Sequence, residues 1–358
     1  MLVELLRFAM SQGASDLHIS AGQPPLLRID GDLRRMDLPP LSVEEARDLV
    51  LDAMSDLQRR NFEQQLELDF AYALEANVRF RVNAFVQNRG YGAVFRVVPN
   101  RILSMNELAL PDVLRRFAEE EKGLVLVTGP TGSGKSTTLA AMIDYINELL
   151  PGHILTLEDP IENVHTPKRC LINQREVGAQ THSFPIALRS ALREDPDVIL
   201  VGELRDLETT ALAMTAAETG HLVLATMHTA SAPKTVDRIL DMFPAAQQNQ
   251  IRTMLAESLV GVVSQMLVKK RGGGRAAALE ILVGTPAVRN LIREGKTHQI
   301  PSTMQVAGRS GMQTMEAAMV QLIQRGVIEI AEARARMPGS EMLNALQQRA
   351  AAATGTNG

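Results

Sequence analysis

Hydrophobic and polar positions in the first hundred residues follow two different periods. Residues 1–12 place leucine and alanine at the spacing of one helix face, which predicts a helix. Ser42, with Glu45 three residues later, forms a capping box and predicts a second helix to about Met54. Three later runs alternate apolar and polar residues and predict strands, at 66–74, 78–82 and 94–98. We therefore expect a small α+β domain over residues 1–98.

The pattern changes after residues 99–110, which are predicted to form a linker. Within it, Ser104 and Glu107 form another capping box, which predicts a helix running to about Glu121. Apolar, β-branched runs then alternate with helical patterns, at 124–128, 153–157, 198–201 and 222–226. This alternation is typical of a parallel sheet covered by helices, so the chain is expected to continue as an α/β domain.

The last third of the chain, from about residue 230 to 345, is predicted to be mostly helical and to form an extension of the α/β domain. The second domain is thus expected over residues 111–345, and the small polar residues of 346–358 predict a disordered tail. In the N-terminal domain, Asp30-Gly31 between two apolar runs predicts a hairpin turn. The length of 358 residues agrees with two domains of roughly 150 residues each.

Composition excludes several classes of protein. Lys and Arg total 37 against 41 for Asp and Glu, a formal charge of −4, whereas nucleic-acid binders are usually basic. Aromatic residues are only 3%, and the one basic run, Lys269-Lys270-Arg271, is predicted to be a solvated loop. The single cysteine, Cys170, is expected to be packed and inert, and it rules out a four-thiolate zinc site within one chain. No apolar stretch approaches the ~18 residues of a membrane span, and a cytoplasmic location is expected.

One motif carries specific chemistry. The residues that form it satisfy G-x-x-x-x-G-K-[ST] and stand between an apolar strand and a predicted helix; they are Gly129, Pro130, Thr131, Gly132, Ser133, Gly134, Lys135 and Ser136, with Thr137 following. Backbone N–H groups of such a loop form a nest for phosphate oxygens. Lys135 is expected to reach the β- and γ-phosphates, and Ser136 to offer its hydroxyl to Mg²⁺. Since no N-K-x-D guanine motif is present, ATP with Mg²⁺ is the expected ligand.

Carboxylates follow two of the predicted parallel strands. Glu158, Asp159 and Glu162 come after the strand at 153–157, and Glu203 comes after the strand at 198–201. Ligands bind at this edge of open α/β sheets, where an acid can orient Mg²⁺ or the attacking water. The usual strand-terminal Asp of a Walker B segment is replaced by Gly202, so Glu203 is expected to serve the metal or the water. Which of Glu158, Glu162 and Glu203 is the catalytic base stays open.

Two further groups are candidates for the site. His228, after the strand at 222–226, is expected to sense the γ-phosphate, whereas His221, at the other end of that strand, is better suited to an interface. Arg79, Arg81 and Arg96 share the polar face of the N-terminal strands. That face is either a solvated surface or a basic surface for an anionic group.

Together these motifs resemble those of the type IV pilus retraction ATPases, the PilT family within the type II/IV secretion ATPase superfamily. The resemblance covers nearly the whole chain: an N-terminal opening at 14–20, an aspartate box at 155–162, a Walker B segment at 195–206 and a histidine box at 219–229. Residues 287–294, Ala-Val-Arg-Asn-Leu-Ile-Arg-Glu, resemble the C-terminal signature associated with retraction, with Val288 where Ile is usual.

The resemblance implies a PAS-like N-terminal domain, a RecA-like P-loop ATPase domain with a helical extension, and a homohexameric ring. It implies that Arg79, Arg81 or Arg96 reaches the γ-phosphate of a neighbouring subunit; Arg189 and Arg193 are weaker candidates. It also implies work at the cytoplasmic face of the inner membrane on a pilus platform protein, peripheral to the membrane and without nucleic acid. A pilus-assembly or type II secretion ATPase, and a hexameric nucleic-acid translocase, are the alternatives.

Overall fold

The computed structural model describes residues 1–29, 31–75, 78–98 and 101–354. The chain divides into two compact units, which are described separately. The first unit comprises Met1–Ile102 together with Asp159–Val164, and the second holds the remainder of the described chain. Among the described residues, no helix is both long enough and apolar enough to cross a membrane.

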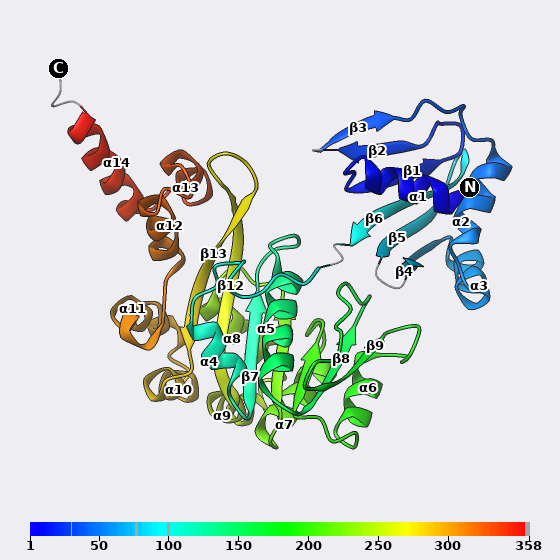
Figure 1. Ribbon diagram of the computed structural model, residues 1–358. Coiled ribbons are helices and arrows are strands. Elements are labelled where there is room, and N and C mark those ends of the chain that lie inside the picture. The colour runs from blue at the N-terminus through cyan, green and yellow to red at the C-terminus, as the bar shows by residue number, and fades with distance from the viewer. Residues whose placement is uncertain (30, 76–77, 99–100, 355–358) are drawn as a thin grey trace. The chain divides into compact units, whose positions relative to one another are not determined.

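The first unit is an antiparallel sheet with helices on one face. Strand order is β3-β2-β1-β6-β5-β4 (Figure 1), with β1 (Asp16–Ser20), β2 (Leu26–Ile29), β3 (Asp32–Arg35), β4 (Glu67–Glu75), β5 (Val78–Gln87) and β6 (Gly90–Val98). Helices α1 (Leu2–Ser11), α2 (Val43–Asp52) and α3 (Asp56–Gln65) bury their apolar faces against it. The core includes Phe62 of α3, Leu17 of β1 and Phe80 of β5.

The two predicted helices and the three predicted strands of this unit are confirmed. The capping box at Ser42 is present with both of its hydrogen bonds. Helix α3 was missed, although its own capping box of Ser55 and Gln58 is a signal of the same kind. Asp30, in the predicted hairpin turn, lies outside the described residues.

The second unit is built on a seven-stranded sheet of order β13-β12-β7-β11-β10-β8-β9. Its strands are β7 (Gly123–Thr128), β8 (His153–Glu158), β9 (Leu171–Glu176), β10 (Val198–Val201), β11 (Leu222–Met227), β12 (Leu259–Lys269) and β13 (Arg275–Val283). All neighbouring pairs are parallel except β12 with β13. The four predicted parallel strands are therefore confirmed.

Helices cover both faces of this sheet (Figure 1). Helices α4 (Val113–Ala118) and α5 (Lys135–Leu149) pack on one face. The other face is covered by α6 (Phe184–Ala191), α7 (Leu207–Glu218), α8 (Ala232–Asp241), α9 (Gln248–Ser258) and α10 (Pro286–Arg293). Strands β7, β10 and β11 are buried throughout, which explains why their sequence is a continuous apolar run.

Most of the segment from 230 to 345 is helical as expected, but the prediction missed a β-hairpin within it. Strands β12 and β13 form a long antiparallel hairpin whose first strand pairs with β7, so this segment completes the sheet. An unbroken apolar run such as residues 259–263 has no period that separates a buried strand from a buried helix. Helices follow the hairpin: α11 (Ile300–Val306), α12 (Met315–Gln324), α13 (Ile330–Arg336) and α14 (Glu341–Thr354).

Two boundaries also differ from expectation. Ser104 and Glu107 make the reciprocal hydrogen bonds of a capping box, but a turn follows and helix α4 begins only at Val113. Residues 346–354, predicted as part of a disordered tail, continue α14. Residues 355–358 lie outside the described part of the chain.

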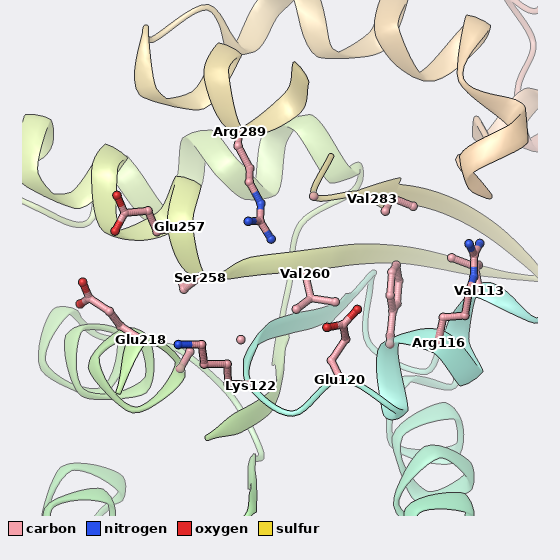
Figure 2. Close-up of a pocket in the computed structure, with 14 residues that line it drawn as sticks. Val113, Arg116, Glu120, Lys122, Glu218, Glu257, Ser258, Val260, Val283 and Arg289 are labelled. Carbon is pink, nitrogen blue, oxygen red and sulfur yellow. The ribbon is translucent and has the colours of Figure 1, made fainter. Parts of the chain in front are cut away.

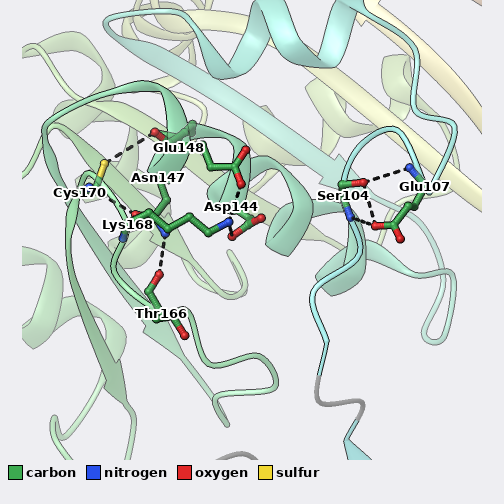
Figure 3. A network of polar contacts seen from close by, with 9 residues as sticks. Ser104, Glu107, Asp144, Asn147, Glu148, Thr166, Lys168 and Cys170 are labelled. Atoms are coloured by element: carbon green, nitrogen blue, oxygen red, sulfur yellow. Dashed lines mark hydrogen bonds and ion pairs between the residues drawn. The ribbon is translucent and has the colours of Figure 1, made fainter.

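A buried amide fixes the loop between β8 and β9 to helix α5 (Figure 3). The side chain of Asn147 is fully buried; its Nδ2 donates to the carbonyl of Thr166 at 2.8 Å. Its Oδ1 accepts from the backbone N–H of Lys168 at 2.9 Å and of Cys170 at 3.3 Å. Cys170 is itself buried and donates to the carbonyl of Leu150, so it has the packed role expected of it.

We expect Asn147→Ala to lower the free energy of unfolding by about 2–4 kcal/mol, because it removes three hydrogen bonds of a fully buried side chain and leaves the buried N–H of Cys170 without its partner. Urea denaturation of the purified protein measures this. The matched control is Ser104→Ala, which removes two exposed hydrogen bonds with Glu107 and should cost about 1 kcal/mol. Equal effects of the two substitutions would contradict the role given to Asn147.

Candidate nucleotide-binding site

The phosphate-binding motif forms the connection between β7 and α5. Gly129 and Gly134 have φ angles of 139° and 89°, which other residues rarely adopt. A Cβ on Gly129 would lie 2.3 Å from the carbonyl oxygen of Gln265, so the backbone approach also requires glycine. Lys135, the first residue of α5, is buried, and its Nζ donates to the carbonyls of Gly129 at 2.9 Å and Pro130 at 3.1 Å.

A single side chain from β12 holds this loop in place. Gln265 is buried, and its Nε2 donates to the carbonyl of Ser133 at 2.7 Å. Its Oε1 accepts a hydrogen bond from the hydroxyl of Thr138 in α5 at 2.7 Å. The amide therefore joins the loop and the first turn of the helix to the neighbouring strand. Gln265 was not among the predicted residues, because an isolated amide in an apolar strand belongs to no local motif.

The geometry of the loop fits a phosphate group. Helix α5 has no side-chain cap at its N-terminus, so its first N–H groups are available to an anion. The hydroxyl of Ser133 is buried without a hydrogen-bond partner among the described residues, which suits a position beside a ligand oxygen. Ser136 and Thr137 are exposed on the first turn, where a hydroxyl can meet a metal ion held by phosphates.

Glu203 and His228 lie together at the same edge of the sheet. Glu203 Oε1 is 3.3 Å from His228 Nε2, and its Oε2 is 2.7 Å from Arg205 Nε. They line a cavity of about 160 Å³ that also includes Thr229 and Arg238. The structure thus brings together two predicted residues that come from different strand ends, after β10 and after β11.

Gly202 precedes Glu203, and its surroundings explain the departure from a Walker B aspartate. A Cβ at this position would lie 3.2 Å from the carbonyl oxygen of Leu157, which is closer than most Cβ contacts. The backbone N–H of Gly202 donates to that carbonyl at 2.7 Å. A longer side chain would disturb this close approach of β10 to β8.

Glu158, the last residue of β8, and Glu162, four residues later, fall in different units. Glu158 stays in the second unit, where its Oε1 accepts from Thr156 Oγ1 at 2.6 Å and Gln174 Nε2 at 3.1 Å. Glu162 belongs to the first unit, and its Oε1 lies 3.4 Å from Arg81 Nη1. The choice of catalytic base among the three glutamates stays a prediction.

The predicted N-terminal arginines lie on the sheet face opposite the helices. Arg81 and Arg96 are directly opposite each other on β5 and β6, and Arg96 donates to Asp16 at 2.7 Å. Burial raises the pKa of Asp16, but hydrogen bonds from Ser15 and Arg96 outweigh it and hold the pKa below its ordinary value. Arg79 has a buried Nε without a hydrogen-bond partner among the described residues. Arg96 is thus held by Asp16, and Arg81 is paired with Glu162, so two of the three arginines have an acid partner in their own unit.

The weaker candidates take structural positions. Nδ1 of His221 lies 3.0 Å from the carbonyl of Ala216, away from the phosphate-binding loop at the start of β11. Arg189 pairs with Glu208. Arg193 is exposed and lies beyond the end of α6, so the two arginines do not share one helix.

The segment at 287–294 forms most of α10 and faces a second cavity (Figure 2). Val288 and Ile292 are buried, whereas Arg289 extends toward a cavity of about 470 Å³ where β7 and β12 begin. Other charged side chains line it: Arg116, Lys122, Glu120, Glu218 and Glu257. None of these charged groups has an ion-pair partner within the described residues, and the loop of residues 129–136 lies at the opposite edge of the sheet.

The sheet, the loop after β7 and the acids at its edge define a P-loop nucleotide-binding domain. Residues 1–335 match the family described as "Type II/IV secretion system protein", and the chain belongs to this family. It is 58% identical over 339 residues to the type IV pilus retraction ATPase PilT of Pseudomonas aeruginosa, covering 94% of this chain and 98% of that protein. It is 54% identical to a twitching motility protein of Neisseria gonorrhoeae, over 96% of this chain and 92% of that protein.

Solved structures agree with this assignment. The crystal structure of the pilus retraction motor PilT with bound ADP superimposes with a TM-score of 0.86 at 47% identity, covering 92% of this chain and 95% of that one. The ATPase DotB of Legionella pneumophila gives a TM-score of 0.79 at 29% identity, covering 94% and 95%. The predicted fold class, a small N-terminal α+β domain followed by a RecA-like ATPase domain, is confirmed by the likeness to PilT.

We expect Gln265→Leu to weaken ATP binding about tenfold, because it removes two hydrogen bonds of about 0.5–1.5 kcal/mol each that hold the loop. Titration with a fluorescent ATP analogue measures the dissociation constant. Gln250→Leu on the exposed face of α9 is the matched control and should bind normally. A Gln265→Leu protein with the affinity of the unmodified chain would contradict the assigned role.

Proposed function

We propose that this chain is an ATP hydrolase whose turnover drives the retraction of type IV pili. The observation that carries this proposal is a complete phosphate-binding loop in a chain 58% identical, over nearly its whole length, to a pilus retraction ATPase. The pilus assembly ATPase PilB of Pseudomonas aeruginosa is only 33% identical, over 75% of this chain. Retraction is therefore favoured over assembly or secretion.

In the proposed mechanism, Lys135 exchanges the carbonyls of Gly129 and Pro130 for β- and γ-phosphate oxygens of ATP. Ser136 offers its hydroxyl to Mg²⁺, which neutralises charge on the phosphates when it is bound. Glu203, held between Arg205 and His228, orients water or the metal at the strand edge. His228 contacts Glu203 directly. If His228 moves when the γ-phosphate is lost, we therefore expect Glu203 to move with it.

We further propose that the active form is a homohexamer with nucleotide between neighbouring copies. The N-terminal face supports this, since Arg81 and Arg96 are like charges directly opposite each other, and their ion pairs with Glu162 and Asp16 leave both guanidinium groups partly exposed to an anion. An arginine supplied from a neighbouring subunit stabilises transition-state charge. We expect the ring to work on a pilus platform protein at the cytoplasmic face of the inner membrane.

We expect Lys135→Ala to abolish ATP hydrolysis, because the charge that meets the transferred phosphoryl group is lost. Steady-state phosphate release from the purified protein measures this, with Lys234→Ala on the exposed face of α8 as the control. In cells that lack the native copy, Lys135→Ala should leave pili extended and surface motility absent. Normal retraction with that variant would overturn the proposed function.

Mixing two inactive variants tests whether an arginine acts across a subunit boundary. Equal amounts of Lys135→Ala and Arg81→Ala protein should recover about a quarter of the unmodified activity, because that share of seams combines an intact lysine with an intact arginine. The same mixture with Arg79→Ala or Arg96→Ala identifies which arginine acts. The proposed trans contact is contradicted if each mixture is as inactive as its components.

A further inference from the structure

Glu280 on β13 has surroundings that the chemistry at the phosphate-binding loop does not explain. It is a partly buried acid in a strand that is apolar from Ala276 to Val283 apart from this residue, and burial raises the pKa of its carboxyl above the ordinary value. Its Oε1 accepts from the backbone N–H of Ala232 at 2.6 Å, and its Oε2 from the backbone N–H of Met315 at 3.4 Å. Its two oxygens therefore meet the first residues of two different helices, α8 and α12.

Both contacts are electrostatically favourable. The N-terminus of a helix carries partial positive charge and unpaired N–H groups, so an anion between two such ends stabilises both. A carboxylate offers an acceptor oxygen to each helix, whereas an amide of the same size offers one acceptor and one donor. The geometry thus needs a carboxylate to satisfy both helix starts.

The first of these helices, α8, begins close in sequence to His228 at the proposed nucleotide site. Helix α8 begins at Ala232, four residues after His228, and Thr229 between them is hydrogen-bonded to Thr235 of the same helix at 2.6 Å. Movement of the segment that carries His228 therefore moves the start of α8. The first N–H of α8, that of Ala232, is the group that donates to Glu280.

The second of these helices, α12, packs with α13 and α14 in a C-terminal helical subdomain. Gln313 pairs with Ile281 through two backbone hydrogen bonds of 2.7 and 3.0 Å, and its Nε2 donates to the carbonyl of Leu279 at 2.9 Å. This short extended piece fixes the chain to β13, and α12 starts two residues later. Met315 and Met319 of α12 then pack in a cluster with residues of β12, β13 and the last two helices.

The loop of residues 129–136 is also connected to the β12–β13 hairpin, which carries Glu280. Ser264 lies opposite Glu280 in the β12–β13 pair and opposite Thr128 in the β12–β7 pair, next to the phosphate-binding loop. Its neighbour Gln265 holds Ser133 and Thr138. Glu280 on β13 is thus separated by the single strand β12 from β7, which leads directly into the phosphate-binding loop.

We propose that Glu280 is a positioning residue that couples nucleotide binding at residues 129–136 to the position of helix α12. It does so by holding the starts of α8 and α12 with one carboxylate. This inference rests on the proposed function, because it requires ATP at the phosphate-binding loop. It does not require the chain to retract pili.

Hydrogen–deuterium exchange of the full chain tests the proposal, with and without the non-hydrolysable analogue AMP-PNP and Mg²⁺. In the unmodified protein we expect the analogue to slow exchange of residues 313–324 about tenfold, within the usual range of coupling between sites. In Glu280→Gln the slowing should be less than about twofold, while the analogue still binds with an affinity within about twofold of the unmodified protein.

A neighbouring carboxylate provides the matched control. Glu316 on α12 accepts hydrogen bonds from Ser340 and from the backbone N–H of Met342, and so connects α12 to α14 but not to α8. Glu316→Gln should change exchange near residue 340 and keep the effect of AMP-PNP on 313–324. Glu280→Asp is the second variant if Glu280→Gln does not fold, since it keeps the charge but is too short to reach both helix starts.

The outcomes separate the two proposals. Failure of the unmodified protein to bind AMP-PNP overturns the proposed function itself. Binding without a change at 313–324, or the same change in the Glu280 variants as in the unmodified protein, overturns the coupling alone. Loss of the change in Glu316→Gln as well would reduce Glu280 to one of several groups that only stabilise the subdomain.

Discussion

The phosphate-binding loop depends on the buried amide of Gln265. Each N–H group of the loop that meets a phosphate is lost to internal hydrogen bonds, and the glycines supply no side chains to pack. The loop must therefore be held through its carbonyls and through the helix that follows, and Gln265 does both by contacting Ser133 and Thr138. This arrangement requires a parallel strand beside β7, which is why the β12–β13 hairpin is an integral part of the sheet.

The sequence predicted most of the fold where side-chain periods are unambiguous. Alternation gave β4, β5 and β6, and the continuous apolar runs gave the central parallel strands. The motif at residues 129–136 predicted the site because its chemistry is local. The hairpin at 259–283 was missed because its buried strand has no hydrophobic period. Gln265 and Glu280, which lie on its two strands, were missed for the same reason. An acid or amide within an apolar strand was the available signal, since such groups are buried only with partners.

The first unit shows a different kind of constraint, in which charge opposes folding. Asp16 is buried between Arg28 and Arg96, and it offsets part of the repulsion along this row of strands. Arg81 has Arg96 as its cross-strand neighbour on that row, and its ion pair with Glu162 is partly exposed. Such a surface pair contributes little. A sheet selected for stability alone would not place like charges opposite each other, so this face is better explained by an anion that the arginines meet in use.

The β12–β13 hairpin contacts the phosphate-binding loop, α8 and α12 through the side chains of Gln265 and Glu280. A motor must convert a small change at a phosphate into movement of a larger element, and packed cores transmit such changes through discrete contacts rather than by bending. Apolar contacts between strands and helices are insensitive to small sliding movements, whereas hydrogen bonds to a single carboxylate or amide depend on position to within a few tenths of an ångström. Polar groups in this hairpin are costly to bury, but they fix the loop, α8 and α12 to one rigid element. Replacing them with apolar residues of similar size would preserve the fold more readily than it would preserve that link.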